Sequence, residues 1–133
     1  ARFGDPECQA VLSLLDSDLM EIFLACREGR LDTLDIRWKG GAACCLVLAS
    51  GGYPGPYVKG LPITGLKQAE ETAVVFHAGT KRGEDGGVRT NGGRVLGVTA
   101  LGENLERAID GAYAAAAHIS FQDMHFRRDI GRI

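Results

Sequence analysis

The chain has 133 residues, of which 45% are hydrophobic, so it can bury a sizeable core, and its length fits one domain because independent folding units typically contain about 100 to 200 residues. Fifteen lysines and arginines against 17 acidic residues give a net charge of -2. The sequence has no long run of like charges that would indicate a surface for nucleic acid or lipid headgroups. The longest apolar stretch, residues 42–49, falls far short of the roughly 18 to 20 residues that cross a bilayer, so we expect no membrane partner either.

Two short helices are predicted at the start of the chain. Asp5 followed by Pro6 is typical of an N-cap and a first helical position, and apolar residues at helical spacing continue to Leu15. Asp18 can cap a second helix, which Gly29 is placed to end in a left-handed conformation. The chain therefore opens with a pair of helices.

A β-hairpin is predicted next. Apolar and polar residues alternate over 34–38, which is the period of a strand with one buried face. A glycine turn at 40–41 then leads into the continuous apolar run 42–49. We expect these two segments to pair with each other.

Further strands and two polar turns follow. Residues 58–64 predict a short edge strand interrupted by a proline, and the β-branched segments 73–77 and 94–100 predict central strands. Between them, 81–87 reads as a glycine-rich hairpin tip and 90–93 contains an Asn-Gly turn. We expect both turns to be exposed.

One long amphipathic helix is predicted near the end of the chain. Residues 103–119 place apolar side chains at helical spacing, and the alanines of this segment permit close packing on a sheet. Residues 124–130 alternate weakly and predict one last strand. The expected fold class is α+β: a mainly antiparallel sheet of barrel-sandwich-like character with a covering helix, preceded by the pair of helices.

The sequence contains no self-sufficient catalytic constellation. The histidines His77, His118 and His125 do not have the paired spacing of a metal site or a catalytic triad. Leu66 stands where a phosphate-binding Walker loop needs its lysine. The adjacent pair Cys44-Cys45 lies on a predicted strand, so the two thiols point to opposite faces and cannot hold one ion. We expect no metal site within the chain.

Three glycine-bearing loops carry polar side chains that suit an anion. Loop 50–55 follows the most hydrophobic predicted strand, loop 77–81 follows another, and loop 91–94 precedes a third. Glycine lets the backbone turn tightly and approach a ligand, so amide groups of such loops can cradle an anion. Glycine is also an ordinary turn device, so each loop alone is a weak signal. All three could converge at one edge of the sheet.

Several sequence blocks occur together in a characteristic order. They are Arg-Phe-Gly-Asp-Pro-Glu at 2–7, Gly-Tyr-Pro-Gly at 52–55, Phe-His-Ala-Gly-Thr at 76–80, Thr-Asn-Gly-Gly-Arg-Val-Leu at 90–96 and Arg-Arg-Asp-Ile-Gly at 127–131. In content and order they resemble the phosphoribosylamine-glycine ligase family, the glycinamide ribonucleotide synthetases of purine biosynthesis, which belong to the ATP-grasp superfamily. The resemblance covers essentially the whole chain, and it corresponds to the C-terminal third of the family protein.

The resemblance implies an activity for the parent protein. The family joins glycine to 5-phosphoribosylamine at the expense of ATP, through a glycyl phosphate intermediate. Phosphoryl transfer to a carboxylate concentrates negative charge, so a magnesium ion and a fixed guanidinium are its natural stabilisers. Arg2 is the catalytic candidate for that guanidinium. The family's magnesium ligands, a Glu and an Asn, would lie just before Ala1, so we expect the parent to hold ATP and magnesium and the chain alone to be inactive.

The resemblance also implies domains and partners. Residues 1–30 correspond to the end of the ATP-grasp domain and residues 31–133 to the C-terminal domain. The expected partners are the small molecules glycine, 5-phosphoribosylamine and ATP, with a monomeric parent. Four cysteines at apolar positions without a disulfide-framework spacing are typical of a reduced protein in the cytoplasm.

By the same resemblance, one wall of the phosphoribosyl site lies on the glycine loops, with Arg94 or Lys81 meeting the phosphate. Ordinary structural roles compete with these assignments: Arg2 could be a helix cap or a surface ion pair, and Arg94 could form a cross-strand salt bridge. The substrate-binding candidates are Asp5, His77, Gly79, Thr80, Asn91, Gly92, Gly93 and Arg94.

Two other functions stay open. One is the C-terminal domain of another ATP-grasp ligase or carboxylase that acts on a different purine intermediate, which the blocks around His77 and Asn91 would discriminate. The other is a non-catalytic anion-binding or carrier module. A lipoyl or biotinyl carrier needs an exposed lysine on a hairpin tip, commonly flanked by methionines, and no methionine flanks Lys81.

Overall fold

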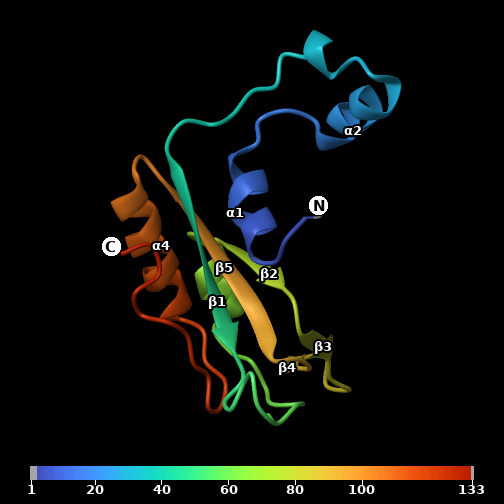
Figure 1. Ribbon diagram of the computed structural model, residues 1–133. Helices are drawn as coiled ribbons and strands as arrows, with labels where there is room; N and C mark the ends of the chain where they lie inside the picture. The colour runs from blue at the N-terminus through green and yellow to red at the C-terminus, as the bar shows by residue number, and fades with distance from the viewer. Residues whose placement is uncertain (1–2, 133) are drawn as a thin grey trace.

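Helices flank a small antiparallel sheet in this protein (Figure 1). The computed structural model describes residues 3–132, and it confirms the predicted α+β class. The elements, in chain order, are α1 (Glu7–Leu14), α2 (Leu19–Glu28), the 3-10 helix η1 (Leu31–Thr33), β1 (Ala42–Ala49), α3 (Leu66–Glu70), β2 (Val74–His77), β3 (Thr80–Arg82), β4 (Val88–Thr90), β5 (Arg94–Gly102) and α4 (Leu105–Ala116).

β5 is the central strand of a three-stranded sheet, with β1 on one side and β2 on the other. Both neighbours run antiparallel to β5, and the register pairs Leu46 with Val98 and Phe76 with Gly97. β3 and β4 form a separate two-stranded hairpin. This strand order does not confirm the expected barrel-sandwich character. It also corrects the central position expected for residues 73–77, which contribute the edge strand β2.

The core lies between the sheet and α4. Alternate residues of a strand point to the same face, and Leu46, Leu48 and Val98 are fully buried on the face that packs against α4. The α4 side of this layer consists mainly of fully buried alanines, namely Ala108, Ala112, Ala115 and Ala116. Small side chains let the helix approach the strands closely, and burial of each leucine contributes roughly 1.5 to 3 kcal/mol. The sheet and α4 therefore form a rigid base for the loops at the strand ends.

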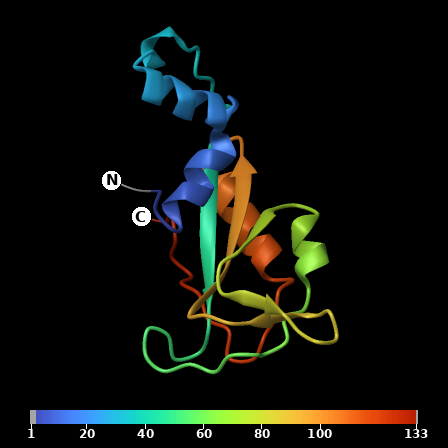
Figure 2. The ribbon, with the colours of Figure 1, turned by 90° about the vertical axis from the view of Figure 1, so that its right-hand side faces the viewer.

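The two N-terminal helices differ in their relation to the sheet. α1 contacts β1 and β5, whereas α2 and η1 project beyond the end of the sheet (Figure 2). Ala25 is the buried residue of α2. The predicted limits of α2 are confirmed: Asp18 accepts hydrogen bonds from the amides of Met20 and Glu21 (2.7 and 3.2 Å), and Gly29 ends the helix at φ 69°.

The predicted hairpin between residues 34–38 and 42–49 is wrong. β1 forms at the expected residues, but its partner is β5, which lies near the other end of the chain. Within 34–38, Trp38 makes a single bridge with Leu15. An apolar strand such as β1 is buried best beside another apolar strand, and local alternation of residues cannot reveal that competing partner.

Two other predicted strands are reduced to isolated bridges. Within residues 58–64 the bridges are at Pro62 and Thr64, and within 124–130 the bridge is at His125. Proline has no amide hydrogen with which to extend a ladder, which limits pairing in the first segment. Both segments therefore act as connections that run along the edge of the fold.

Candidate functional site

Three loops meet at one end of the three-stranded sheet, as the glycine pattern led us to expect. β1 and β2 end there and β5 begins there, because both neighbours run antiparallel to β5 (Figure 1). Ser50, which follows β1, anchors the loop before β5: its amide donates to the Gly93 carbonyl (N to O, 2.8 Å) and its hydroxyl to the Gly92 carbonyl (Oγ to O, 2.8 Å). Ser50 is buried, so these hydrogen bonds are shielded from water.

The second loop packs backbone to backbone on the third. The Asn91 amide donates to the Gly79 carbonyl (2.7 Å), and the Gly79 amide donates to the Val95 carbonyl (3.1 Å). A Cβ added to Gly79 would lie 2.6 Å from the Cα of Gly92 and 2.9 Å from its nitrogen, so a side chain does not fit. Glycine at 79 is therefore required by the close approach of the two loops.

The third loop is more enclosed than predicted. Asn91 is exposed, as expected for a turn, but Gly93 is buried. The ring of Tyr53, from the first loop, occupies the space that a side chain on Gly93 would need. Of the two predicted turns, the hairpin tip at 81–87 is the one that is largely exposed, as predicted.

His77 and Thr80 are brought together at the end of β2. The His77 Nδ1 lies 2.9 Å from the Thr80 Oγ1, which is hydrogen-bonding distance. Both residues border a shallow depression of about 340 Å³, whose other lining residues are Lys81, Arg82 and Val88. Two cationic side chains beside a polar pair give this depression the character of an anion site.

Asp5 and Arg94 lie against each other across the N-terminal segment and the start of β5. The Arg94 Nη1 donates to the backbone carbonyl of Asp5 (2.7 Å), and its Nη2 lies 3.6 Å from the Asp5 Oδ2. The predicted N-cap role of Asp5 is wrong, because Pro6 is the N-cap of α1. The Asp5 Oδ1 instead accepts a hydrogen bond from the Gln9 side chain (3.0 Å). The structure thus joins Asp5 to the loop cluster through Arg94.

Arg2, the catalytic candidate, lies outside the described residues. The structure brings the other eight candidates together in two groups. Loop residues form one group, and the pair Asp5 and Arg94 forms the other. Sequence reasoning gave no individual role to Ser50 and Tyr53, which hold the loops in place, although both lie in the glycine-rich loop 50–55. It missed Gln9 altogether, because a glutamine in a helical stretch carries no local signal for this contact.

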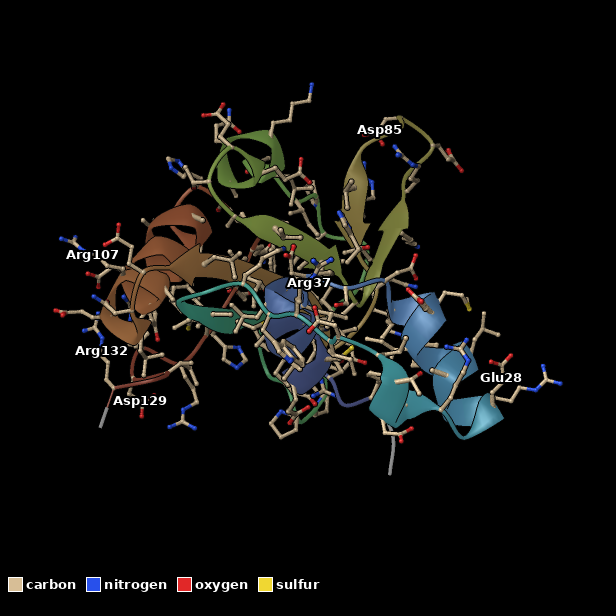
Figure 3. All side chains as sticks on the ribbon, turned by 90° about the horizontal axis from the view of Figure 1, so that it is seen from above. Glu28, Arg37, Asp85, Arg107, Asp129 and Arg132 are labelled. Carbon is tan, nitrogen blue, oxygen red and sulfur yellow. The ribbon has the colours of Figure 1, made fainter. Side chains whose placement is uncertain are left out.

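The exposed hairpin tip beside the depression has its own ion pair. Asp85 accepts a hydrogen bond from the Gly87 amide (3.1 Å) and one from the Arg89 Nη2 (2.9 Å). Figure 3 shows Asp85 at the tip of the hairpin, away from the sheet. The Gly87 hydrogen bond first, and then Arg89, lower the pKa of the Asp85 carboxyl below its ordinary value.

This pKa gives a testable pH dependence. Because the folded-state pKa is depressed, the tip contact is fully formed above the ordinary pKa of an aspartate and is lost as pH falls through the lower folded value. Arg89→Ala should raise the Asp85 pKa only part of the way back, since the Gly87 hydrogen bond remains. A carboxyl ¹³C NMR titration measures both values. Arg82→Ala is the control: it removes the same charge from the same hairpin, but the Arg82 side chain donates to the Gly86 carbonyl and not to Asp85. This variant should change the Asp85 pKa less. An Asp85 titration midpoint unaffected by Arg89→Ala would contradict the assignment.

Potential metal ligands are scattered over residues 3–132. Within them no three His, Cys, Asp or Glu side chains are grouped so as to hold a metal ion; the magnesium ligands that the resemblance implies would lie before Ala1. The four cysteines are free thiols, and burial raises the pKa of Cys44 and Cys45. None of the helices in this range combines the length and apolarity needed to cross a bilayer.

Several known proteins similar to this chain carry the name phosphoribosylamine-glycine ligase. The family model described as Phosphoribosylglycinamide synthetase, C domain, matches residues 43–133. Phosphoribosylamine-glycine ligases of Nostoc sp. and Synechocystis sp. are 53% and 55% identical over 132 residues, which cover 98% of this chain and 31% of each relative. The sequence similarity therefore extends across both the loop cluster and the segment before it.

A solved structure agrees with the sequence comparisons. The crystal structure of a phosphoribosylamine-glycine ligase from Thermotoga maritima aligns with a TM-score of 0.75 at 34% identity, covering 98% of this chain and 32% of that chain. The chain spans about a third of the length of the ligases that it matches. The resemblance drawn from the sequence blocks is confirmed, and the chain belongs to the phosphoribosylglycinamide synthetase family, whose C domain it contains.

Proposed function

We propose that this chain forms the C-terminal part of an ATP-dependent ligase that joins glycine to 5-phosphoribosylamine through a glycyl phosphate intermediate, giving glycinamide ribonucleotide, ADP and phosphate. The ligases that share 53% and 55% of its residues support this assignment. The observation that supports a direct part for this region is the meeting of loops 50–55, 77–81 and 91–94 at one end of the sheet.

In this proposal the loop cluster forms one wall of the phosphoribosyl site. Its backbone is already held by hydrogen bonds, so the groups that face a substrate need no ordering on binding, which favours affinity. Lys81 and Arg82 give the depression beside His77 a positive charge that suits a phosphate. Because Asp5 already engages Arg94, Lys81 is the better placed of our two phosphate-binding candidates. The residues proposed to line the wall are Asp5, His77, Gly79, Thr80, Asn91, Gly92, Gly93 and Arg94.

The phosphoryl-transfer chemistry would belong to other parts of the ligase. Arg2 is our candidate for the guanidinium that stabilises the transferring group. ATP and magnesium would be held by polypeptide that precedes this chain in the parent, and a bound magnesium ion would neutralise charge on the phosphates. The chain alone would then bind part of the substrate but would not turn over.

We also propose that residues 1–30 complete an ATP-grasp domain and that 31–133 form the C-terminal domain of a monomeric, cytoplasmic ligase. Large apolar side chains near the N-terminus remain 41% to 62% exposed, which is unusual for so short a stretch: Val11, Met20, Phe23, Leu24, Leu31 and Trp38. Exposed apolar surface commonly marks contact with other protein. The remainder of the ligase would cover it.

A chimeric ligase tests the proposal. The matching 132 residues of the Synechocystis ligase are replaced by this chain, and formation of ADP and glycinamide ribonucleotide is followed. We expect turnover that requires ATP, glycine and 5-phosphoribosylamine together, and none from the isolated chain. The double substitution His77→Ala and Lys81→Ala should raise the KM for phosphoribosylamine on the order of tenfold, since about 1.4 kcal/mol of binding corresponds to that factor.

Lys67→Ala, on α3 and away from the loops, is the matched control and should leave KM unchanged. A chimera that unfolds at the temperature of the parent ligase yet forms no product would refute the proposal. Turnover of ATP by the isolated chain would do the same. Product formed only with another amine acceptor would favour the alternative of a different ATP-grasp ligase.

A further inference from the structure

Arg94 joins two parts of the chain that are 89 residues apart in sequence. Its guanidinium contacts Asp5 twice, through the backbone carbonyl at 2.7 Å and through the carboxylate at 3.6 Å. The carboxylate is held from its other side by the Gln9 amide group at 3.0 Å. These contacts fix both the backbone and the side chain at the start of α1.

The base of Arg94 is itself held firmly. Gly93, the preceding residue, packs under the Tyr53 ring and accepts the Ser50 amide hydrogen bond at 2.8 Å. The Arg94 carbonyl faces Gly79, whose amide binds Val95 in β5. The guanidinium is therefore carried on a backbone with little freedom, and it contacts the N-terminal segment just before α1 begins. Ordering should pass from the loop cluster to the segment, because the more rigid partner restrains the other.

We propose that Arg94 takes its place in the wall as a positioning residue: its guanidinium fixes residues 3–9 on the loop cluster, and Lys81, not Arg94, meets the phosphate of the substrate. This inference rests on the proposed function, because the segment that it fixes directly follows Arg2, our candidate for the catalytic guanidinium. Arginine suits the task, since its planar group can contact a carbonyl and a carboxylate at once. The Arg94 and Asp5 side chains are both more than two-fifths exposed. Their contacts, which we call the tie, therefore align the segment more than they raise the free energy of unfolding.

Hydrogen exchange of the full 133-residue chain tests the tie without requiring ligase activity. Arg94→Ala should speed amide exchange in residues 7–10 roughly fivefold to tenfold, because one charged hydrogen bond and one ion contact are lost. The Cys8 amide, which donates to the Gly4 carbonyl, is the best single reporter. Arg94→Lys should give a smaller increase in exchange than Arg94→Ala, because an ammonium can keep one of the two contacts but cannot reproduce both.

Arg89→Ala is the matched control, since it also removes a partly exposed, ion-paired arginine, but one on the hairpin. Amide exchange in residues 7–10 should not change in that variant. If Arg94→Ala also leaves it unchanged, the tie does not order the segment and the inference is overturned. Should Arg94→Ala fail to fold, Arg94→Lys provides the same test.

The chimeric ligase then separates positioning from substrate contact. A positioning role predicts that Arg94→Ala lowers kcat on the order of tenfold with little change in the KM for phosphoribosylamine. Adding Asp5→Ala to Arg94→Ala should cost little more, because coupled residues are not additive. A raised KM with unchanged kcat would show instead that Arg94 contacts substrate. A chimera without any activity would refute the proposed function, whereas the exchange result on the chain would stand independently.

Discussion

Gly79→Ala is expected to lower the free energy of unfolding by about 3 kcal/mol, at the upper end of the cost of overpacking a tightly packed site. The new methyl group would meet three backbone atoms, among them the Gly92 Cα at 2.6 Å and the Gly92 nitrogen at 2.9 Å. Backbone atoms cannot rotate away as a flexible side chain can. The two loops would have to separate, which would also break the hydrogen bond from Asn91 to the Gly79 carbonyl. Urea unfolding of the purified chain measures the loss.

Gly40→Ala is the control for this prediction. No atom lies within 4 Å of the position that its Cβ would take, so its free energy of unfolding should change by less than about 0.5 kcal/mol. Equal effects of the two substitutions would mean that the loops do not pack as the structure shows. In the chimeric ligase, Gly79→Ala should also abolish most activity, because the proposed wall depends on this packing.

Leu46→Ala should destabilise the protein by about 2 to 5 kcal/mol. Leu46 is 0% exposed and lies on β1 opposite Val98 of the central strand, facing the alanines of α4. Truncation removes buried apolar surface and leaves a cavity that a close-packed helix and sheet cannot readily fill. The midpoint of urea unfolding should fall while its slope stays the same, since the chain still exposes a similar surface on unfolding.

Leu101→Ala makes the same chemical change on the central strand at a side chain that is 46% exposed. Its cost should stay below about 1.5 kcal/mol, because half of the side chain is already in water. Equal losses in the free energy of unfolding for the two substitutions would contradict the position of the core between the sheet and α4. Together the two substitutions test whether α4 or the opposite face covers the main apolar layer.

The three loops of the candidate site could be predicted from the sequence, but the contact that joins Asp5 to them could not. Glycines beside polar residues marked the three loops, because tight turns and close backbone approach need that residue type. The convergence of the loops follows from antiparallel pairing of β1 and β2 with β5. The Asp5 to Arg94 contact could not be predicted, since Asp5 followed by Pro6 looks like a helix start and nothing local indicates a partner 89 residues away.

The sequence by itself determined where several elements begin and end and to which family the chain belongs. Asp18 and Gly29 mark the limits of α2, and the apolar runs mark β1 and β5, because capping, helical period and strand period act through neighbours a few residues apart. The family blocks are likewise contiguous stretches of residues. Only the tertiary structure decided that β1 pairs with β5 and that β2 lies at the edge. Those choices depend on which of several apolar strands buries the most surface against α4, and that competition among distant segments leaves no mark on any single stretch of sequence.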